Sequence, residues 1–178
     1  MNGWSEWNNT FDAMINYSDI TGTNKIILDG DVIIAHSFET DSEAEAAVSL
    51  SIMAGGGVGM ADMPEKLADW AWVYKNREIL GLNKEGLIGK PLSKVTDTAD
   101  SPHSSSQIWI GRVKSGDWIV GLFNREDTAG GRTIDFKTLG ISGKANVRDI
   151  WMHKNLGSMS SITLRVEPHG VAMLRISK

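Results

Sequence analysis

The chain of 178 residues has no cysteine, only four prolines and no long apolar run. Without cysteine, thiol catalysis, iron–sulfur clusters, thiolate zinc sites and a disulfide scaffold are all excluded. No stretch approaches the roughly 20 apolar residues of a membrane-spanning helix, and the N-terminus lacks the basic-then-apolar pattern of a signal peptide. We therefore expect a folded protein that has no membrane partner.

Positive charge is neither abundant nor massed in this sequence. The 18 Lys and Arg residues are outnumbered by 22 Asp and Glu residues, which gives a net charge of −4. A nucleic-acid-binding protein would concentrate basic residues on one face or element. The histidines show no metal-ligand spacing; they are His36, His103, His153 and His169. We expect no nucleic-acid partner, no metal ion and no cofactor.

The first half of the chain alternates helical and strand-like patterns. Apolar residues recur every three to four positions over 4–17, which predicts an amphipathic helix. Residues 25–35 are β-branched and apolar on both faces, as in a strand buried in a parallel sheet. A helix beginning with a capping Asp or Ser, a short strand and a further helix follow at 41–54, 58–61 and 69–82. This is the rhythm of an α/β unit.

The pattern changes after a polar stretch. Residues 93–106 are rich in Ser, Thr, Asp and Lys with little to bury, which is typical of a linker. Beyond it, short alternating segments are separated by turns, and a row of such strands predicts an antiparallel sandwich. The expected strands are 107–113, 117–124, 133–136, 146–151, 162–166 and 171–176.

Two carboxylates stand out in the first predicted strand. Asp29 and Asp31 lie two residues apart in otherwise apolar sequence, so in a strand both side chains point to the same face. One interpretation is that the strand delivers them to a polar pocket, to a sugar hydroxyl or to a metal. The other is that the strand ends here and the two acids cap a turn around Gly30.

Glycines and serines in the middle of the chain do not form a recognised catalytic motif. The Gly-rich run 55–59 lacks the Lys-Ser/Thr of a phosphate loop, and it follows a predicted helix rather than a strand. A turn that ends the helix and enters a closely packed strand explains it better. Ser49 and Ser51 show no nucleophile-elbow context, so a serine hydrolase is unsupported.

Three tryptophans lie on or beside predicted strands of the second half: Trp109, Trp118 and Trp151. Indole rings in such positions can stack on sugar rings. Tryptophan that alternates with polar neighbours in a sandwich usually faces inward, so we interpret these residues as core.

The order and spacing of several segments resemble those of the α-galactosidase and α-N-acetylgalactosaminidase family of glycoside hydrolases (family 27, clan D). In the first half the similar segments are ILDGDVIIA (27–35), 41–56, GMADMPEKL (59–67) and NREILGLNKEGLIG (76–89). In the second half they are GDWIVGLFNR (116–125), VRDIW (147–151), KNLG (154–157) and EPHGV (167–171).

This resemblance implies roles for the two carboxylates. The second Asp of the family's Asp-Pro-Asp motif contacts the sugar in the −1 pocket and matches Asp31, and the first matches Asp29. Gly30 stands where the family has Pro, and Val32 where it has Met. Retaining enzymes need a nucleophile and an acid/base about 5 Å apart. In the family both come from earlier barrel strands, so the resemblance assigns no catalytic residue to this chain.

The resemblance also implies the domain organisation. Residues 1–92 would be the C-terminal portion of a (β/α)8 barrel, 93–106 a linker and 107–178 an antiparallel β-sandwich. A complete barrel needs about 250 residues, so we expect a C-terminal fragment of a retaining hydrolase for α-galactoside-like substrates, inactive alone. Its exposed strand edges predict pairing between copies, or a rearranged N-terminal half.

Two other functions are compatible with the residues. The sandwich of a non-catalytic carbohydrate-binding or interaction module would use exposed tryptophans to stack on glycans. Alternatively, the sandwich only stabilises the barrel and has no ligand of its own, which the absence of an aromatic stripe favours after about residue 106.

Overall fold

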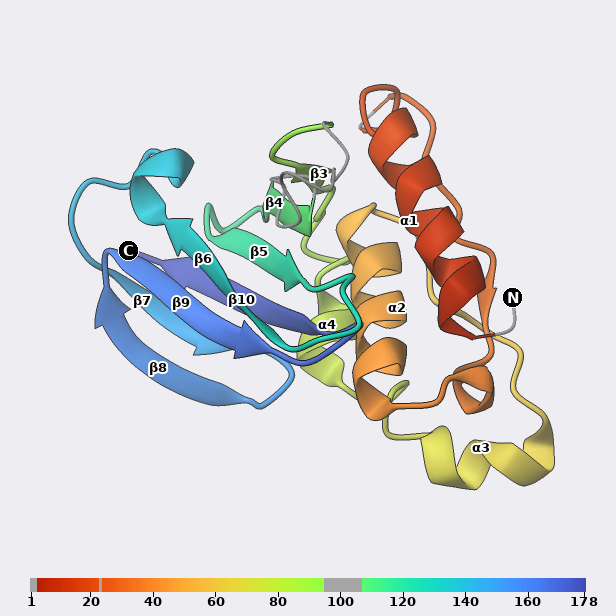
Figure 1. The fold of residues 1–178 in the computed structure, drawn as a ribbon. Helices are drawn as coiled ribbons and strands as arrows, with labels where there is room; N and C mark the ends of the chain where they lie inside the picture. Colours follow the sequence, from red (N-terminus) through yellow and green to blue (C-terminus); the bar gives the residue numbers. More distant parts are fainter. Residues whose placement is uncertain (1–2, 23, 95–106) are drawn as a thin grey trace.

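The computed structural model describes residues 3–22, 24–94 and 107–178. Its helices lie on one side of a six-stranded antiparallel sheet, and a two-stranded sheet lies on the other (Figure 1). Within the described residues, no helix is long and apolar enough to cross a membrane. The expected fold class, a barrel portion followed by an antiparallel sandwich, is confirmed.

Two helices form where the apolar spacing predicts them. Helix α1 (Trp4–Tyr17) buries the stripe that begins at Trp7 and Phe11, and helix α2 (Asp41–Met53) packs between α1 and the large sheet (Figure 1). The expected Asp or Ser cap of α2 is wrong. The cap is Thr40, whose Oγ1 accepts a hydrogen bond from the Glu43 N–H at 3.3 Å, because a side chain must precede the first turn to reach its free N–H groups.

The long buried strand expected over 25–35 is also wrong. Only β1 (Val32–Ile33) is a strand, and it pairs in parallel with β2 (Gly59–Met60). Ile26 and Ile27 are 52% and 60% exposed. In the described part of the chain this parallel sheet has two strands, so no further strand covers Ile26 and Ile27, whereas Leu28 packs against the core on the helical side. A short 3-10 helix, η1 (Ala35–Ser37), follows the strand.

The single helix expected over 69–82 is two helices instead. Helix α3 (Pro64–Trp70) begins with a proline, which suits the first turn, and α4 (Arg77–Gly81) begins after Asn76. The Asn76 Oδ1 accepts hydrogen bonds from the N–H groups of Glu78 and Ile79. This cap starts a new helix in the middle of a continuous apolar pattern.

The sandwich contains all six expected strands and two more. The large sheet has the order β3-β4-β5-β10-β7-β8, and the small one pairs β6 with β9. Their bounds are β3 (Lys90–Pro91), β4 (Ile108–Arg112), β5 (Trp118–Phe123), β6 (Gly130–Asp135), β7 (Ala145–Asp149), β8 (Lys154–Met159), β9 (Ser161–Val166) and β10 (Val171–Ser177). A 3-10 helix, η3 (Phe136–Leu139), follows β6. The edge strand β8 was not predicted because it is polar and mostly exposed.

The central strands of the large sheet, β5 and β10, pack against a core on each face. Val120 and Leu122 of β5 face the small sheet, whereas Ile119 and Phe123 belong to a second core shared with the helices. Met173 of β10 joins that second core. Alternate residues of a strand point to opposite faces, so each central strand contributes to both cores.

The expected domain limits of 1–92 and 107–178 stay a prediction. The core on the helical side contains residues from both ranges, and β3 of the first range pairs with β4 of the second. Most of the expected linker, residues 95–106, lies outside the described residues.

Removing the Phe11 ring is expected to destabilise both halves together. Phe11 packs edge-on against Trp109 and Phe123, with ring centroids 6.1 and 5.0 Å apart. Because the site is fully enclosed, Phe11→Ala should lower the free energy of unfolding by about 3–5 kcal/mol. Urea unfolding measures this, with Tyr17→Ala on the same helix as the exposed control, expected to change it by less than about 0.5 kcal/mol. Equal effects of the two substitutions would contradict the shared core.

Candidate functional site: a cavity at the parallel strand pair

The two predicted sugar-binding carboxylates lie in a turn just before β1. The Asp29 Oδ1 accepts a hydrogen bond from the Asp31 N–H at 3.0 Å, and the Asp31 Oδ1 accepts one from the Val32 N–H at 2.8 Å. Asp31 has a φ of 62°, a left-handed conformation that Asp tolerates through such local bonds. The expectation of a shared strand face is therefore wrong. The two acids do bond backbone N–H groups around Gly30, as the alternative predicted, but the strand begins after them rather than ending there.

Asp29 and Asp31 nevertheless line one cavity of about 470 Å³. Its other lining residues come from the chain before β1 and from the Gly-rich turn before β2: Ile27, Leu28, Val32 and residues 56–59. Gly56 lets this turn pack closely against the backbone of Leu28, because a Cβ on Gly56 would lie 2.7 Å from the Leu28 carbonyl oxygen. The cavity is concave and carries carboxylates, which suits hydroxyl groups of a sugar.

The position of this cavity on the barrel strands matters. It lies where β1 and β2 begin, since Val32 and Gly59 are the first residues of the two strands. Enzymes built on (β/α)8 barrels place their active sites at the carboxyl ends of the strands. The fold brings Asp29 and Asp31 together, but at the amino ends of β1 and β2.

A buried polar cluster occupies the carboxyl ends of the same strands. The Asp62 side chain is fully buried and lies just after β2. Its Oδ1 lies 2.7 Å from His36 Nδ1 and accepts a hydrogen bond from the His36 backbone N–H at 2.8 Å. Its Oδ2 accepts a hydrogen bond from the Tyr74 hydroxyl. Burial opposes ionisation, but the bonds from Tyr74 and His36 outweigh it and lower the pKa of Asp62. Burial and the Asp62 carboxylate raise the pKa of Tyr74. Asp62 is therefore ionised and accepts hydrogen bonds from the His36 N–H and the Tyr74 hydroxyl.

The sequence analysis did not single out this cluster. Asp62 directly follows the predicted strand 58–61, so its place at a strand end was a usable signal. His36 and Tyr74 come from separate segments, and only the folded chain brings them to Asp62.

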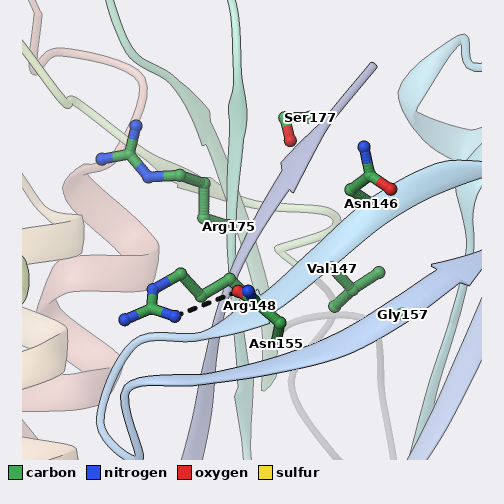
Figure 2. Close-up of a pocket in the computed structure, with 7 residues that line it drawn as sticks. All are labelled: Asn146, Val147, Arg148, Asn155, Gly157, Arg175 and Ser177. Atoms are coloured by element: carbon green, nitrogen blue, oxygen red, sulfur yellow. Dashed lines mark hydrogen bonds between the residues drawn. The ribbon is translucent and has the colours of Figure 1, made fainter.

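A second cavity, of about 340 Å³, lies on the large sheet between β7, β8 and β10 (Figure 2). Arg148 and Arg175 are opposite each other on neighbouring strands, and both are among the residues that line this cavity (Figure 2). Adjacent like charges are unfavourable, so each needs an acid. Arg148 donates two 2.7 Å bonds to Glu78, and Arg175 bonds Glu85 and Asp117. Both arginines are therefore paired with acids, and the Arg148–Glu78 pair attaches α4 to the sandwich.

The tryptophans behave largely as core. Trp109 is fully buried. Trp118 is half-buried beneath the Arg112 guanidinium, whose carbon lies 5.0 Å from the ring centroid. Trp151 is half-buried too, and its indole N–H donates to Ser49 Oγ at 2.8 Å. Core packing is confirmed for Trp109, whereas the other two keep part of their rings accessible.

Histidine 169 connects three parts of the fold. Its Nδ1 lies 2.8 Å from Glu43 Oε1, its Nε2 lies 2.9 Å from Asp127 Oδ1, and its ring stacks on the Trp4 ring with centroids 4.7 Å apart.

Across residues 3–22, 24–94 and 107–178, no group of three or more acidic or histidine side chains is arranged to hold a metal.

The sandwich and the whole chain both match known glycoside hydrolases. Residues 103–176 match the family described as the α-galactosidase C-terminal β-sandwich domain. The chain is 40% identical to the isomalto-dextranase of Arthrobacter globiformis, over 98% of this chain and 28% of that protein. The structure of the Arthrobacter globiformis T6 enzyme complexed with panose has a TM-score of 0.84, covering 94% of this chain and 29% of that one at 40% identity.

A more distant structure shows the same fold. The family 27 β-L-arabinopyranosidase of Geobacillus stearothermophilus has a TM-score of 0.80 at 17% identity, over 99% of this chain and 43% of that one. Fold and cavity thus define a barrel tail with its sandwich. The chain is similar to the C-terminal part of α-galactosidase-like glycoside hydrolases of family 27, as the resemblance predicted. It spans 28% of the length of the curated relative that it matches.

Acid should release α4 from the sandwich. The bonds from Arg148, opposed by burial and helped by His153, lower the pKa of Glu78 from 4.5 to about 2. A lowered carboxyl pKa stabilises the fold above the unfolded value and loses that effect as the pH falls toward the folded value. Wild-type stability should therefore fall between about pH 4.5 and pH 2 by more than that of Glu78→Gln. Urea unfolding across this range measures the difference, and parallel pH profiles would contradict it.

Proposed function

We propose that this chain is the C-terminal part of a retaining glycoside hydrolase for α-linked oligosaccharides, and that β1 and β2 are the last two strands of its barrel. The observation that carries the proposal is the 40% identity to isomalto-dextranase over 98% of the chain. The whole protein would then bind carbohydrate, with nucleic acid and membrane excluded as partners by the charge and hydropathy of the sequence.

The uncovered apolar residues around β1 and β2 support a larger barrel. Ile26, Ile27, Met60 and Met63 are each at least half exposed in the described structure. Barrel strands earlier in the same polypeptide would cover them and pair with the free strand edges. Pairing between two copies of this chain is the alternative arrangement, and it predicts a dimer in solution.

The reactive carboxylates would come from those earlier strands. A retaining enzyme needs two carboxyl groups about 5 Å apart across the scissile bond, one as nucleophile and one as acid/base. One carboxylate oxygen of Asp29 and one of Asp31 each accept a hydrogen bond from a nearby backbone N–H. The two residues also lie in the same loop, two positions apart, and do not face each other across a cleft. We therefore expect the isolated chain to be inactive.

The relatives differ in how strongly they support a particular substrate, because their identities to this chain differ. The α-galactosidase of Saccharomyces cerevisiae, solved with raffinose, is 17% identical and supports the fold alone. The isomalto-dextranase at 40% identity supports an isomalto-dextran-type substrate more strongly. An α-galactoside stays the alternative substrate, and both belong in the test.

Asp29 and Asp31 remain the proposed sugar-binding residues. Their shared cavity supports this role, whereas their position before the first residues of β1 and β2 counts against it, because barrel enzymes bind substrate at the carboxyl ends of the strands. If the sugar instead lies only at the carboxyl ends, His36 and Tyr74 are nearer to it.

A hybrid enzyme tests the proposal. The matching segment of the Arthrobacter globiformis isomalto-dextranase is replaced by this chain, and sugar release is measured from dextran and from nitrophenyl α-galactoside. The hybrid should hydrolyse dextran, and the isolated chain neither substrate. A folded but inactive hybrid, or turnover by the chain alone, contradicts the proposal.

Substitution of Asp31 within the hybrid tests the sugar-binding role. Loss of a hydrogen bond to a charged group costs about 1.5–3 kcal/mol, so Asp31→Asn should raise KM roughly tenfold to hundredfold. Glu65→Gln, an exposed carboxylate in α3, is the matched control and should leave KM unchanged. An unchanged KM for Asp31→Asn, with folding verified by circular dichroism, would remove Asp31 from the sugar pocket.

The non-catalytic binding module stays a second candidate function. The observation that favours it is the partial exposure of Trp118 and Trp151 on the sandwich side. It predicts that the isolated chain binds glycans without any contribution from a barrel.

A further inference from the structure

Two indole rings meet at the seam between the helices and the sandwich, away from the strand-pair cavity. Trp72 follows α3 and is 36% exposed, and Trp151 follows β7. Their ring centroids are 6.2 Å apart with an interplanar angle of 71°. Large exposed aromatic surface is costly, and a pair of this kind commonly marks a binding surface.

The pair forms one wall of a cavity of about 380 Å³. Glu45, Lys75, Asn76 and His153 complete its lining. Glu45 and Trp151 also line a neighbouring cavity of about 260 Å³ between α2 and the β9–β10 end of the sandwich. Glu45 therefore lies where two hollows meet, and the larger hollow is within the size range of small-molecule sites.

Most polar atoms that hold this wall in place are already satisfied. The Trp151 indole N–H is bonded to Ser49 Oγ at 2.8 Å, which fixes the ring on α2. The Asn76 amide donates to the Ile150 carbonyl at 3.2 Å while its oxygen caps α4. The platform is thus rigid before any ligand arrives, which lowers the entropic cost of binding.

The Glu45 carboxyl is a polar group of this lining that has no partner in the described structure. In the described structure it makes no hydrogen bond or ion pair, although it is half-buried. Burial first, and then the charges of Asp149 and Asp41, raise its pKa to about 7. Near neutral pH the carboxyl is therefore present in both forms and can accept from or donate to a hydroxyl.

The other charges in the cavity make a charged ligand a poor fit. Lys75 contributes a positive charge to the lining of the same cavity, and His153 lies 2.6 Å from the carboxylate of Glu78. Neutral hydroxyl groups satisfy such a mixed lining without leaving an unpaired charge. Aromatic faces suit the apolar C–H face of a pyranose ring, so both kinds of lining point to a sugar.

We propose that Trp72, Trp151 and Glu45 form a second carbohydrate site, in which a pyranose ring packs on the indole pair and its hydroxyls bond the Glu45 carboxyl. The site contains no catalytic residue and is separate from the Asp29–Asp31 cavity. The choice of an α-linked oligosaccharide as ligand rests on the proposed function. The geometry of the site does not require the rest of a barrel.

Panose titration of the isolated chain tests this site, with binding followed by tryptophan fluorescence and by calorimetry. The wild-type chain should bind, while sorbitol at the same concentration should give no signal. Trp72→Ala and Glu45→Gln should each weaken binding about tenfold or more. Tyr17→Ala is the control, because the Tyr17 ring is exposed on α1 and does not line this cavity, and it should leave affinity unchanged.

The outcomes separate this proposal from the proposed function. Binding that survives Asp31→Asn and is lost in Trp72→Ala supports the second site, whether or not the hybrid enzyme is active. No binding of panose by the chain overturns the site even if the hybrid hydrolyses dextran. Binding that survives Trp72→Ala and Glu45→Gln, with folding verified by circular dichroism, overturns it as well.

Discussion

Burial of helix α2 on every side is the constraint on which the rest of the fold depends. From Ala46 to Met53 each side chain is buried, with α1 on one flank and β5 and β10 on another (Figure 1). A helix that is apolar all round is stable only when other elements enclose it. The barrel portion and the sandwich therefore share one interior through this helix.

The polar contacts of α2 place the functional surfaces. Thr40 and Glu43 fix its start, and Glu43 also reaches His169 in the sandwich. Ser49 orients Trp151, and Glu45 borders the cavity that Trp151 lines. Where α2 ends, the glycine turn closes over Leu28 and forms the wall of the Asp29–Asp31 cavity. One helix thus positions both candidate sugar surfaces.

Much of the fold could be predicted from local periodicity, and the failures have physical causes. Helix α1 and the six expected strands follow from apolar spacing that repeats every 3.6 or 2 residues, whereas α2 follows from the signals that begin and end it, because it is buried on every side. The strand over 25–35 failed because burial depends on neighbouring strands, which the local sequence does not contain. Asn76 split a predicted helix because a cap competes with an otherwise continuous apolar pattern.

The candidate sites were predictable only in part. Asp29 and Asp31 stand out as charges in an apolar run, and they do share a cavity, although in a turn. The cluster around Asp62 and the seam at Trp72 and Trp151 combine residues from distant segments. Only the folded chain brings these residues together, and no local pattern encodes their pairing.

On the proposed function, strands β1 and β2 are an incomplete edge that the remainder of a barrel closes. Hydrogen–deuterium exchange over residues 25–34 and 58–63, compared between the isolated chain and the hybrid enzyme, tests it most directly. The account predicts rapid exchange in the chain and strong protection in the hybrid, because only paired and buried amides resist exchange. Equal protection in both would show that the edge is already closed and would contradict the account.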